Sequence, residues 1–353
     1  MNKISIKGRG TSLNPGNRFE KMRVEIDPEW LEQEGLPPAP TTYFIDNSIS
    51  ILSKNDSPDI PFTYSLNPYR GCEHGCIYCY ARPTHEYLGW SSGLDFETRI
   101  LVKPRAPALL ERELCKPGWR PQVIMLSGNT DCYQIAERRL CLTRGCLEVL
   151  LRYRNPVGII TKNALILRDL DLLQELARLD LVAVTLSITT LDNQLCRKME
   201  PRTSAPEKRL AAIARLAAAG IPAGVNFAPV IPGLNDHEMA AVLAAAAERG
   251  ATHAGYLLLR LPHAVSELFK NWLAVHYPGR AAKVLHALAG MRQGRLNDPC
   301  FGSRMTGEGE HAETIARLFA VCCRKYGLNQ HALPLSTGHF RRPQAQTDLF
   351  GHT

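Results

Sequence analysis

The chain has 353 residues, of which 45% are hydrophobic and 22% charged, and this composition excludes a wholly disordered or fibrous protein. Its 42 lysines and arginines outnumber 34 acidic residues, which gives a formal net charge of +8. Such a charge attracts polyanions, unless it only reflects solvated helix faces. We expect solvated helix faces to carry Arg138, Arg139, Arg168, Arg209 and Arg215.

The N-terminal sequence lacks the continuous apolar core of a secretory signal. No later stretch approaches about 18 uninterrupted apolar residues, so no membrane segment is expected. We therefore predict a cytoplasmic protein. Eleven cysteines in a reducing compartment favour metal binding or redox chemistry over disulfides.

The first 59 residues contain several prolines, including those of "EGLPPAPTTY", and predict an extended arm that crosses the surface of the next domain. From about residue 60 the chain alternates short apolar runs with amphipathic segments. Short apolar runs bounded by turn signals are typical of buried parallel strands. We predict strands at 63–70, 123–130, 156–163, 181–190, 221–233 and 253–262.

The segments between these strands repeat apolar residues at helical spacing, and two of them end at Gly220 and Gly250, which suit the position after a helix. Six βα units fall short of the eight in a closed barrel. We therefore predict an α/β fold, a partial (β/α)6 TIM-type barrel over residues 60–262. A doubly wound open sheet is the alternative.

Beyond the barrel, residues 263–335 predict a C-terminal helical region, and residues 336–353 a polar, flexible tail. The glycine-rich loop "NDPCFGSRMTGEG" contains Cys300 and Arg304 and either covers the active-site mouth or simply connects two helices. The remaining cysteines in helix-like segments are expected to be small core residues. These are Cys141, Cys146, Cys196, Cys322 and Cys323.

Three cysteines, Cys72, Cys76 and Cys79, stand at C-x3-C-x2-C spacing in "GCEHGCIYC", directly after the first predicted strand. Barrel enzymes place their chemistry at this end of the strands. A zinc ion would take His74 as its fourth ligand. An iron-sulfur cube normally takes four thiolates, so three would leave one iron open to an external ligand.

The stretch "CEHGCIYC" resembles the cluster motif of the radical S-adenosylmethionine (SAM) superfamily. The longer "NPYRGCEHGCIYCYAR" and the later "PVIPGLND" resemble its spore photoproduct lyase-like branch. The resemblance covers roughly residues 60–262. It implies a 4Fe-4S cluster on Cys72, Cys76 and Cys79, SAM chelated by the open iron, and reductive cleavage of SAM to a 5′-deoxyadenosyl radical. An electron donor such as flavodoxin or ferredoxin is implied as well.

Residues at the strand ends are expected to hold SAM. In place of the family's Gly-Gly-Glu-like stretch the chain offers Ser127, Thr130 and Asp131, the last two of which also suit a helix cap. By resemblance, Lys162 binds the methionine carboxylate. Further contacts are expected from Ser187, Asn226 and Ala228 near the ribose and adenine, and from Tyr78 and Tyr80 near the cluster, unless these two tyrosines only pack under the loop.

The substrate is unassigned by the sequence. Spore photoproduct lyases are implied to carry a hydrogen-returning cysteine where this chain has Gly128, which argues against thymine-dimer reversal. The nearest thiol, Cys132, is the candidate hydrogen donor. A nucleic-acid lesion or modification is the favoured substrate class. The competing hypothesis is a non-catalytic iron-sulfur or zinc protein that binds nucleic acid.

The tail sequence "QTDLF" resembles the peptide by which bacterial replication and repair proteins dock on the sliding clamp. Its matching residues are Gln346, Asp348, Leu349 and Phe350. Such a peptide inserts apolar anchors into a preformed groove of its partner. A solvated tail without a partner is the alternative.

Overall fold

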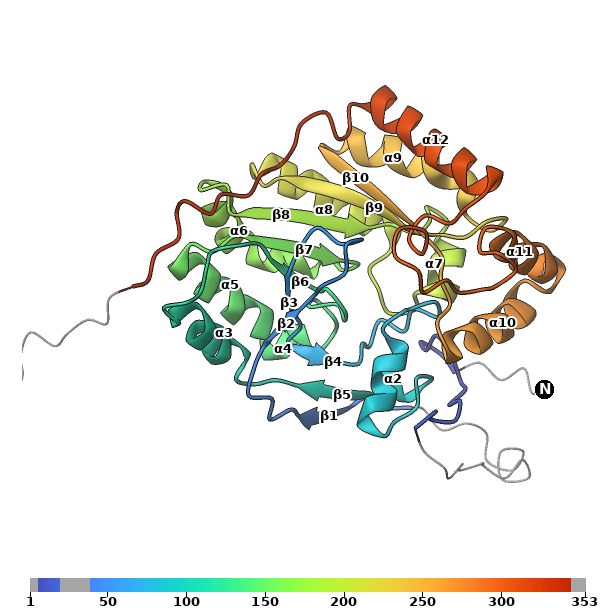
Figure 1. The fold of residues 1–353 in the computed structure, drawn as a ribbon, viewed down its shortest axis with the longest axis horizontal. Helices are drawn as coiled ribbons and strands as arrows, with labels where there is room; N and C mark the ends of the chain where they lie inside the picture. Colours follow the sequence, from blue (N-terminus) through green and yellow to red (C-terminus); the bar gives the residue numbers. More distant parts are fainter. Residues whose placement is uncertain (1–5, 20–38, 344–353) are drawn as a thin grey trace, which may run out of the picture.

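The computed structural model describes residues 6–19 and 39–343, and its centre is a curved seven-stranded sheet (Figure 1). The strand order is β10-β9-β8-β7-β6-β3-β2, and only the edge pair β2 and β3 is antiparallel. The strands are β2 (Leu52–Lys54), β3 (Tyr64–Leu66), β6 (Ile124–Leu126), β7 (Val157–Thr161), β8 (Val182–Ser187), β9 (Ala223–Val230) and β10 (His253–Leu258).

The six parallel strands follow one another in chain order, from β3 at one side to β10 at the other. A doubly wound sheet would reverse direction at an internal switch point, and this sheet has none. The partial (β/α)6 barrel is therefore confirmed and the open-sheet alternative is wrong.

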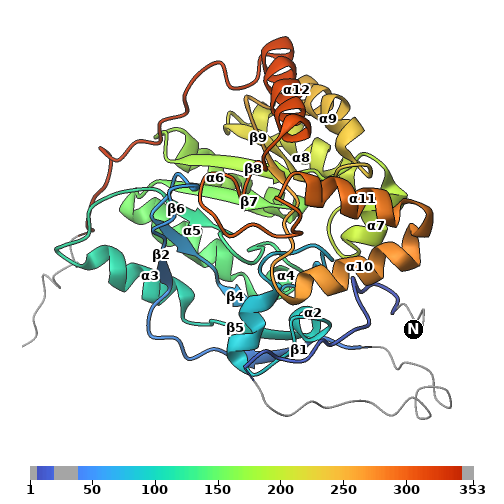
Figure 2. The same cartoon turned by 45° about the vertical axis from the view of Figure 1, so that its right-hand side comes forward.

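The strands form the inner layer of the barrel, and helices cover the outer face of the curved sheet (Figures 1 and 2). α6 and α8 pack on β8, α9 packs on β9, and α12 packs on α9. The helices up to β10 are α2 (Asp95–Thr98), α3 (Ala106–Cys115), α4 (Glu137–Leu140), α5 (Leu142–Tyr153), α6 (Leu170–Ala177), α7 (Asn193–Met199), α8 (Pro206–Ala218) and α9 (Met239–Glu248), with the 3-10 segments η1 (Arg82–Leu88), η2 (Ala164–Asp169) and η3 (Asp236–Glu238). Gly220 and Gly250 follow α8 and α9 with φ of 72° and 89°, as expected.

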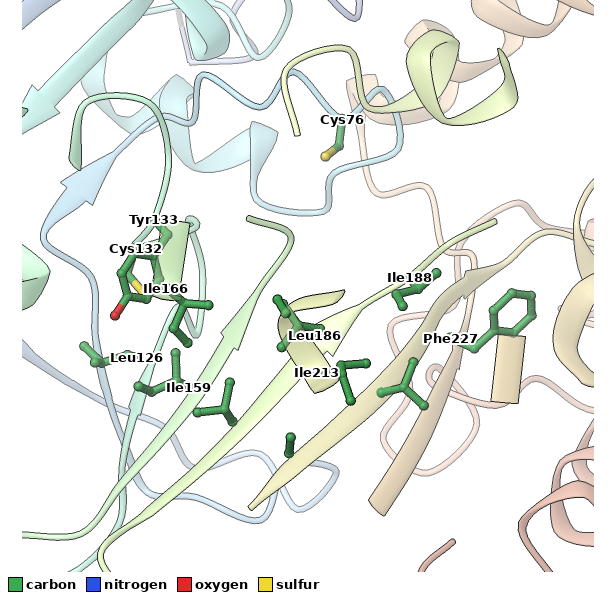
Figure 3. Packing of buried hydrophobic residues seen from close by; sticks show 14 of the residues in the cluster. Cys76, Leu126, Cys132, Tyr133, Ile159, Ile166, Leu186, Ile188, Ile213 and Phe227 are labelled. Atoms are coloured by element: carbon green, nitrogen blue, oxygen red, sulfur yellow. The ribbon is translucent and has the colours of Figure 1, made fainter. Parts of the chain in front are cut away.

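The core lies between the strands and the helices, where apolar side chains from neighbouring strands come into register (Figure 3). Ile159 pairs with Val184, and Leu186 pairs with Val225. All four are essentially inaccessible to solvent. Burying such a side chain contributes about 1.5–3 kcal/mol, so these runs hold the strands whose ends carry the site.

The N-terminal region differs from the predicted arm. β1 (Thr42–Ile45) pairs in parallel with β5 (Arg99–Val102), which also pairs with β4 (Tyr69–Arg70) in a second, three-stranded sheet. β2 completes the barrel sheet. β1 and β2 are too short and too exposed to show an alternating apolar pattern, so they could not be predicted from the amino-acid sequence.

The C-terminal region contains α10 (Ala264–His276), α11 (Pro278–Gly290) and α12 (Glu310–Tyr326), as the apolar spacing predicted. The loop around Cys300 is tied to β10 by a hydrogen bond from the Leu258 amide to the Met305 carbonyl. The clamp-like peptide at 346–350 lies outside the described residues. Across the described ranges, every helix is too short or too polar to span a bilayer.

Three expectations about single side chains were wrong. Arg168 is not on a solvated face, because it pairs with the buried carboxylates of Glu137 and Asp169. Arg209 is not part of a solvated face, because its side chain is fully buried against Glu200. Cys141 is exposed instead of buried, since it adopts a left-handed conformation (φ 52°) that separates α4 from α5.

Candidate active site at the carboxyl ends of the strands

The cysteine loop (residues 71–80) follows β4 and carries all three cysteines of the motif. Cys72 and Cys76 are buried and Cys79 is half-buried, and none forms a disulfide. The Cys72 amide donates to the Phe96 carbonyl at 2.9 Å, and the Cys79 amide donates to the Cys76 carbonyl at 3.2 Å. The backbone therefore presents three thiols from a single short turn.

A buried ion pair fixes this loop from below. Arg82 donates from Nε to the Cys76 carbonyl at 3.0 Å and from Nη2 to Glu97 Oε1 at 2.6 Å. Both charged side chains are completely buried. Burial raises the pKa of Glu97, although Arg82 and the Gly10 amide partly oppose this rise. Because each charge has lost its water, the pair is costly to break.

The N-terminal strap (residues 8–17) closes over the same loop. The Gly10 amide donates to Glu97 Oε2 at 2.9 Å. A Cβ on Gly10 would lie 1.8 Å from the Gly75 carbonyl oxygen, so only glycine allows this approach. Gly75 itself has φ of +66°, which glycine adopts without strain. The two glycines bring the strap and the loop into backbone contact.

Two of the three thiols lie where burial disfavours the thiolate form. Burial raises the pKa of Cys76, and it raises that of Cys79 to about 11 with a further contribution from Cys72. A bound metal displaces such thiol protons. Within the described residues, no three His, Cys, Asp or Glu side chains converge as ligands of one ion. The cysteines of an iron-sulfur cluster bind different irons, so their sulfurs need not converge on one metal ion.

His74 contacts Asp131 and Asn163 as well as Cys72, so it could serve as the fourth ligand of the zinc alternative only by giving up these hydrogen bonds. Its Nδ1 lies 3.3 Å from Asp131 Oδ2, and its Nε2 lies 3.3 Å from the Asn163 amide nitrogen. Burial opposes the imidazolium, but Asp131 and Cys72 outweigh it and raise the pKa of His74 to about 10. His74 therefore holds the cysteine loop against the ends of β6 and β7.

Asp131 is the centre of this contact and uses both carboxylate oxygens. Its Oδ1 accepts from Thr161 Oγ1 at 2.7 Å and from the Tyr133 amide at 2.8 Å. Its Oδ2 accepts from the Lys162 amide at 2.8 Å. The expected helix cap at Thr130 or Asp131 is wrong, because the next helix, α4, begins only at Glu137 and the Asp131 carboxylate closes a turn instead. Its direct contact with SAM stays a prediction.

Lys162 extends from the end of β7 toward a buried carboxylate that the sequence did not single out. Its Nζ lies 3.5 Å from Glu200 Oε1 and donates to the Ala228 carbonyl at 3.2 Å. Glu200 also accepts from Tyr78 Oη and pairs with Arg209 at 2.5 Å. Burial opposes this charge, but Arg209 and Lys162 hold the pKa of Glu200 well below its usual range.

The other predicted contacts of SAM lie on neighbouring strand ends. Ser187 at the end of β8 is in register with Asn226 of β9. Ser187 is buried and Asn226 is half-buried. Asn226 lies over Gly255 of β10, where a Cβ would come within 2.5 Å of the amide oxygen. The structure brings these residues together with Lys162 and Ala228, and their roles stay predictions.

Ser127 and Thr130 have structural partners of their own. Ser127 adopts φ of +68° and accepts the Cys132 amide at 2.8 Å. The buried hydroxyl of Thr130 donates to the Tyr69 carbonyl at 2.7 Å. These hydrogen bonds shape the turn after β6.

Cys132 faces the core. Its side chain is fully buried beside Tyr133 and Ile166, well apart from Cys76 (Figure 3). Burial and the Asp131 charge raise the pKa of its thiol well above the ordinary value. This position does not favour contact with a substrate, and a role as hydrogen donor stays a prediction.

Comparison with known proteins shows which protein family this chain matches. The model of the radical SAM superfamily matches residues 66–246. An uncharacterized protein of Mycobacterium tuberculosis strain H37Rv is 41% identical over 221 residues, which cover 62% of this chain and 65% of that protein. An uncharacterized protein of Methanocaldococcus jannaschii is 32% identical over 178 residues, or 50% of this chain and 63% of its own length. The chain thus matches slightly less than two thirds of these relatives.

Among solved structures, spore photoproduct lyase complexed with dinucleoside spore photoproduct aligns with a TM-score of 0.58 at 16% identity, over 81% of this chain and 80% of that one. A double mutant of the same enzyme, with bound AdoMet and dinucleoside spore photoproduct, aligns equally well. At this identity the likeness establishes a shared fold.

Proposed function

Because the chain belongs to the radical SAM superfamily, we propose that it holds a 4Fe-4S cluster on Cys72, Cys76 and Cys79 and cleaves SAM reductively at that cluster. The family makes the chain an enzyme of SAM-dependent radical chemistry. The donor set supports the proposal, since three thiols on one turn, two of them buried and one half-buried, would leave the fourth cluster iron for SAM. When bound, the cluster and SAM supply a 5′-deoxyadenosyl radical.

One electrostatic observation carries the proposal for SAM. Glu200 is balanced by Arg209, and His74 is balanced by Asp131. Lys162 has no second acid within the described residues, so this closely packed site retains one positive charge. Lys162 and Arg209 share the single carboxylate of Glu200, and the carboxylate of SAM would neutralise the positive charge that is left over.

The residues around this charge have distinct tasks. Glu200 and the Ala228 carbonyl hold the Lys162 ammonium in place. Tyr78 precedes Cys79 and hydrogen-bonds Glu200, which couples the cysteine loop to the SAM-binding side. Ser187 and Asn226 are proposed to face the ribose and adenine. The protein thus orients the cofactor before reaction, which is its main contribution in cofactor enzymes.

For the substrate we propose a lesion or modification in a nucleic acid. The net charge of +8 and the fold shared with spore photoproduct lyase support this class. Thymine-dimer reversal itself is not proposed, because a Cβ on Gly128 would come within 2.6 Å of Ser65 Cβ. The turn has no room for a cysteine there without a backbone shift.

The proposal extends to partners. A low-potential donor such as flavodoxin or ferredoxin would supply the electron, and a cytoplasmic location suits both donors. Docking of residues 346–350 on a sliding clamp is a separate proposal, supported by the sequence pattern alone. Deleting residues 346–353 tests it, since clamp co-purification should be lost while iron content is retained.

Anaerobic reconstitution followed by reduction in the presence of SAM tests the proposed chemistry. The wild-type chain should bind about four irons and release 5′-deoxyadenosine. Cys76→Ala should lose both properties, whereas Cys141→Ala, which removes an exposed thiol outside the loop, should keep them. A chain that binds one zinc and releases no deoxyadenosine would contradict the proposal and favour the non-catalytic alternative.

Lys162 offers an independent test by SAM titration. Hydrogen bonds to charged groups contribute about 1.5–3 kcal/mol, so Lys162→Met should raise the Kd for SAM roughly 10- to 100-fold. Lys162→Arg keeps the charge and should lose less. Equal affinity of the methionine variant and the wild type would exclude Lys162 as the carboxylate partner.

A further inference from the structure

Arg260 stands just beyond the end of β10, at the same edge of the sheet as the cysteine loop. Its neighbours Leu259 and Leu261 are buried on either side, while Arg260 is half-buried. The guanidinium carbon lies 5.1 Å from the centroid of the Tyr80 ring. A charged side chain inside the apolar run "LLLRLP" therefore turns away from the core and toward the active site.

Within the described residues this cation forms no ion pair, although the charge of Asp59 attracts it from a greater distance. Over residues 6–19 and 39–343, no carboxylate pairs with Arg260 and no oxygen hydrogen-bonds its guanidinium. Nearby Asp59 is already paired with Arg304 at 2.5 Å. Burial and the Arg304 charge lower the pKa of Arg260. A half-buried guanidinium without an ion pair keeps N–H donors that an anionic ligand can accept from.

The Tyr80 ring under Arg260 is fixed in place. It directly follows Cys79, is 44% exposed, and donates from its hydroxyl to the Gly128 carbonyl at 2.9 Å. Tyr80 thus joins the cysteine loop to the turn after β6, and Arg260 extends this connection to β10. The stacked pair lies beside the proposed cluster and remains accessible.

A second pair of the same kind lies next to the first. The guanidinium carbon of Arg304 is 4.6 Å from the ring centroid of Phe301, which is 58% exposed. Arg304 is anchored by Asp59 and by Ser57 Oγ at 2.5 Å, and the Gly302 amide donates to Asp59 at 2.7 Å. The two arginine–aromatic pairs, Arg260 with Tyr80 and Arg304 with Phe301, are called the rim.

The rim combines exposed aromatic rings with guanidinium groups. Proteins that bind single-stranded nucleic acid use this combination, since bases stack on rings and phosphates pair with arginine. Arg304 already has its carboxylate, so Arg260 is the guanidinium left for a phosphate.

We propose that Arg260 binds a backbone phosphate of a single-stranded nucleic acid and sets the target nucleotide beside Tyr80. This inference rests on the proposed function, because it names the contact that brings the substrate to the radical-forming site. A base held outside its duplex is also the form in which an enzyme reaches its reactive atoms.

Fluorescence anisotropy with a labelled single-stranded oligonucleotide and the reconstituted full chain tests the proposal. Arg260→Gln should weaken binding roughly 10-fold and reduce the slope of log K against log salt by about 0.7, the value for one phosphate on a single strand. Arg260→Lys should keep the slope and lose less affinity. Arg215→Gln removes an exposed charge from α8 on the outer face and should behave like the wild type.

Three results would overturn the inference. One is equal loss in the Arg260→Gln and Arg215→Gln variants, which would show a diffuse charge effect. Another is unchanged affinity in both Arg260 variants. The third is displacement of the oligonucleotide by a mononucleotide at equal phosphate concentration, which would assign the rim to a small phosphorylated ligand.

The failure of this inference can be told apart from that of the proposed function. Oligonucleotide binding through Arg260 without any 5′-deoxyadenosine release would overturn the proposed function alone. Release of deoxyadenosine by a chain whose Arg260 variants bind like the wild type would overturn the inference alone.

Discussion

Two of the places where an arginine lies over a phenylalanine ring, one beneath the cysteine loop and one on the rim, differ in burial. Beneath the cysteine loop, the Arg82 guanidinium lies 5.4 Å from the Phe96 ring centroid, and both side chains are almost fully buried. On the rim, Arg304 lies 4.6 Å from Phe301, more than half of which is exposed. The same contact geometry therefore occurs in two very different dielectric environments.

The difference separates the cofactor side from the substrate side. The buried pair is locked by Glu97, the strap and a glycine-to-glycine backbone contact, which fixes three thiols in advance. The rim leaves one guanidinium and two rings accessible. Pre-organisation suits a cofactor that is held for catalysis, whereas exposed groups suit a substrate that must enter and leave.

The largest effect should come from the buried ion pair. Arg82→Met leaves Glu97 charged and unpaired, which should lower the free energy of unfolding by about 3–5 kcal/mol. Urea denaturation of the cluster-free chain measures this. Arg178→Met breaks an exposed pair with Glu175 and should cost about 1 kcal/mol or less. Equal costs would refute the contrast between the two environments.

The second-largest loss of stability should come from disrupting the contact between the N-terminal strap and the cysteine loop. Gly10→Ala places a methyl group against the Gly75 carbonyl, and such overpacking costs about 1–3 kcal/mol. The denaturation midpoint should fall, and iron incorporation should fall with it. Gly279→Ala adds a methyl group to α11 with no atom within 4 Å and should be neutral or stabilising. A wild-type midpoint for Gly10→Ala would mean that the strap moves freely.

A pH effect of about 2 kcal/mol should come from His85, which is buried in η1. Burial lowers its pKa from 6.5 to about 4, and its Nε2 donates to the Arg99 carbonyl at 3.0 Å in the neutral form. Between these values only the unfolded chain binds the proton, so this residue makes stability fall from pH 7 to pH 5. His85→Gln should remove that part of the pH dependence in urea titrations. If the free energy of unfolding of His85→Gln still falls from pH 7 to pH 5 by as much as that of the wild type, His85 is not the group responsible.

The smallest effect should come from the rim. Phe301→Ala removes an exposed cation–π contact and should cost about 1 kcal/mol or less. Phe96→Ala removes a ring that is 1% exposed and should cost about 3–5 kcal/mol. Thermal unfolding of the two variants compares them directly. Similar losses would show that the rim is as tightly packed as the cluster side.

The sequence predicted the repeating units well because their signals are local. Short apolar runs gave all six parallel strands, and the glycines at 220 and 250 marked two helix ends. The spacing of the three cysteines left a zinc site and a cluster open, and the resemblance of "CEHGCIYC" to the radical SAM motif favoured the cluster. The family match covers residues 66–246, which include this cysteine loop.

The surroundings of the site were harder to predict, because they depend on residues distant in the chain. Arg209 looked like one more charge on a helix face, yet it is buried against Glu200, so that it shares this carboxylate with Lys162. Asp131 carried a helix-cap signal that gave no hint of its contact with His74. No pattern marked Gly10 as the residue that lets the strap reach the cysteine loop.

By itself, then, the sequence determined the strand order, the helical layer and the thiols, all of which follow from spacing within short segments. Only the tertiary structure decided which charges are balanced, which glycines touch, and that Arg260 reaches Tyr80 without an acid of its own. Electrostatic balance depends on the distances between side chains and on the water they have lost. Those quantities exist only once the chain has folded.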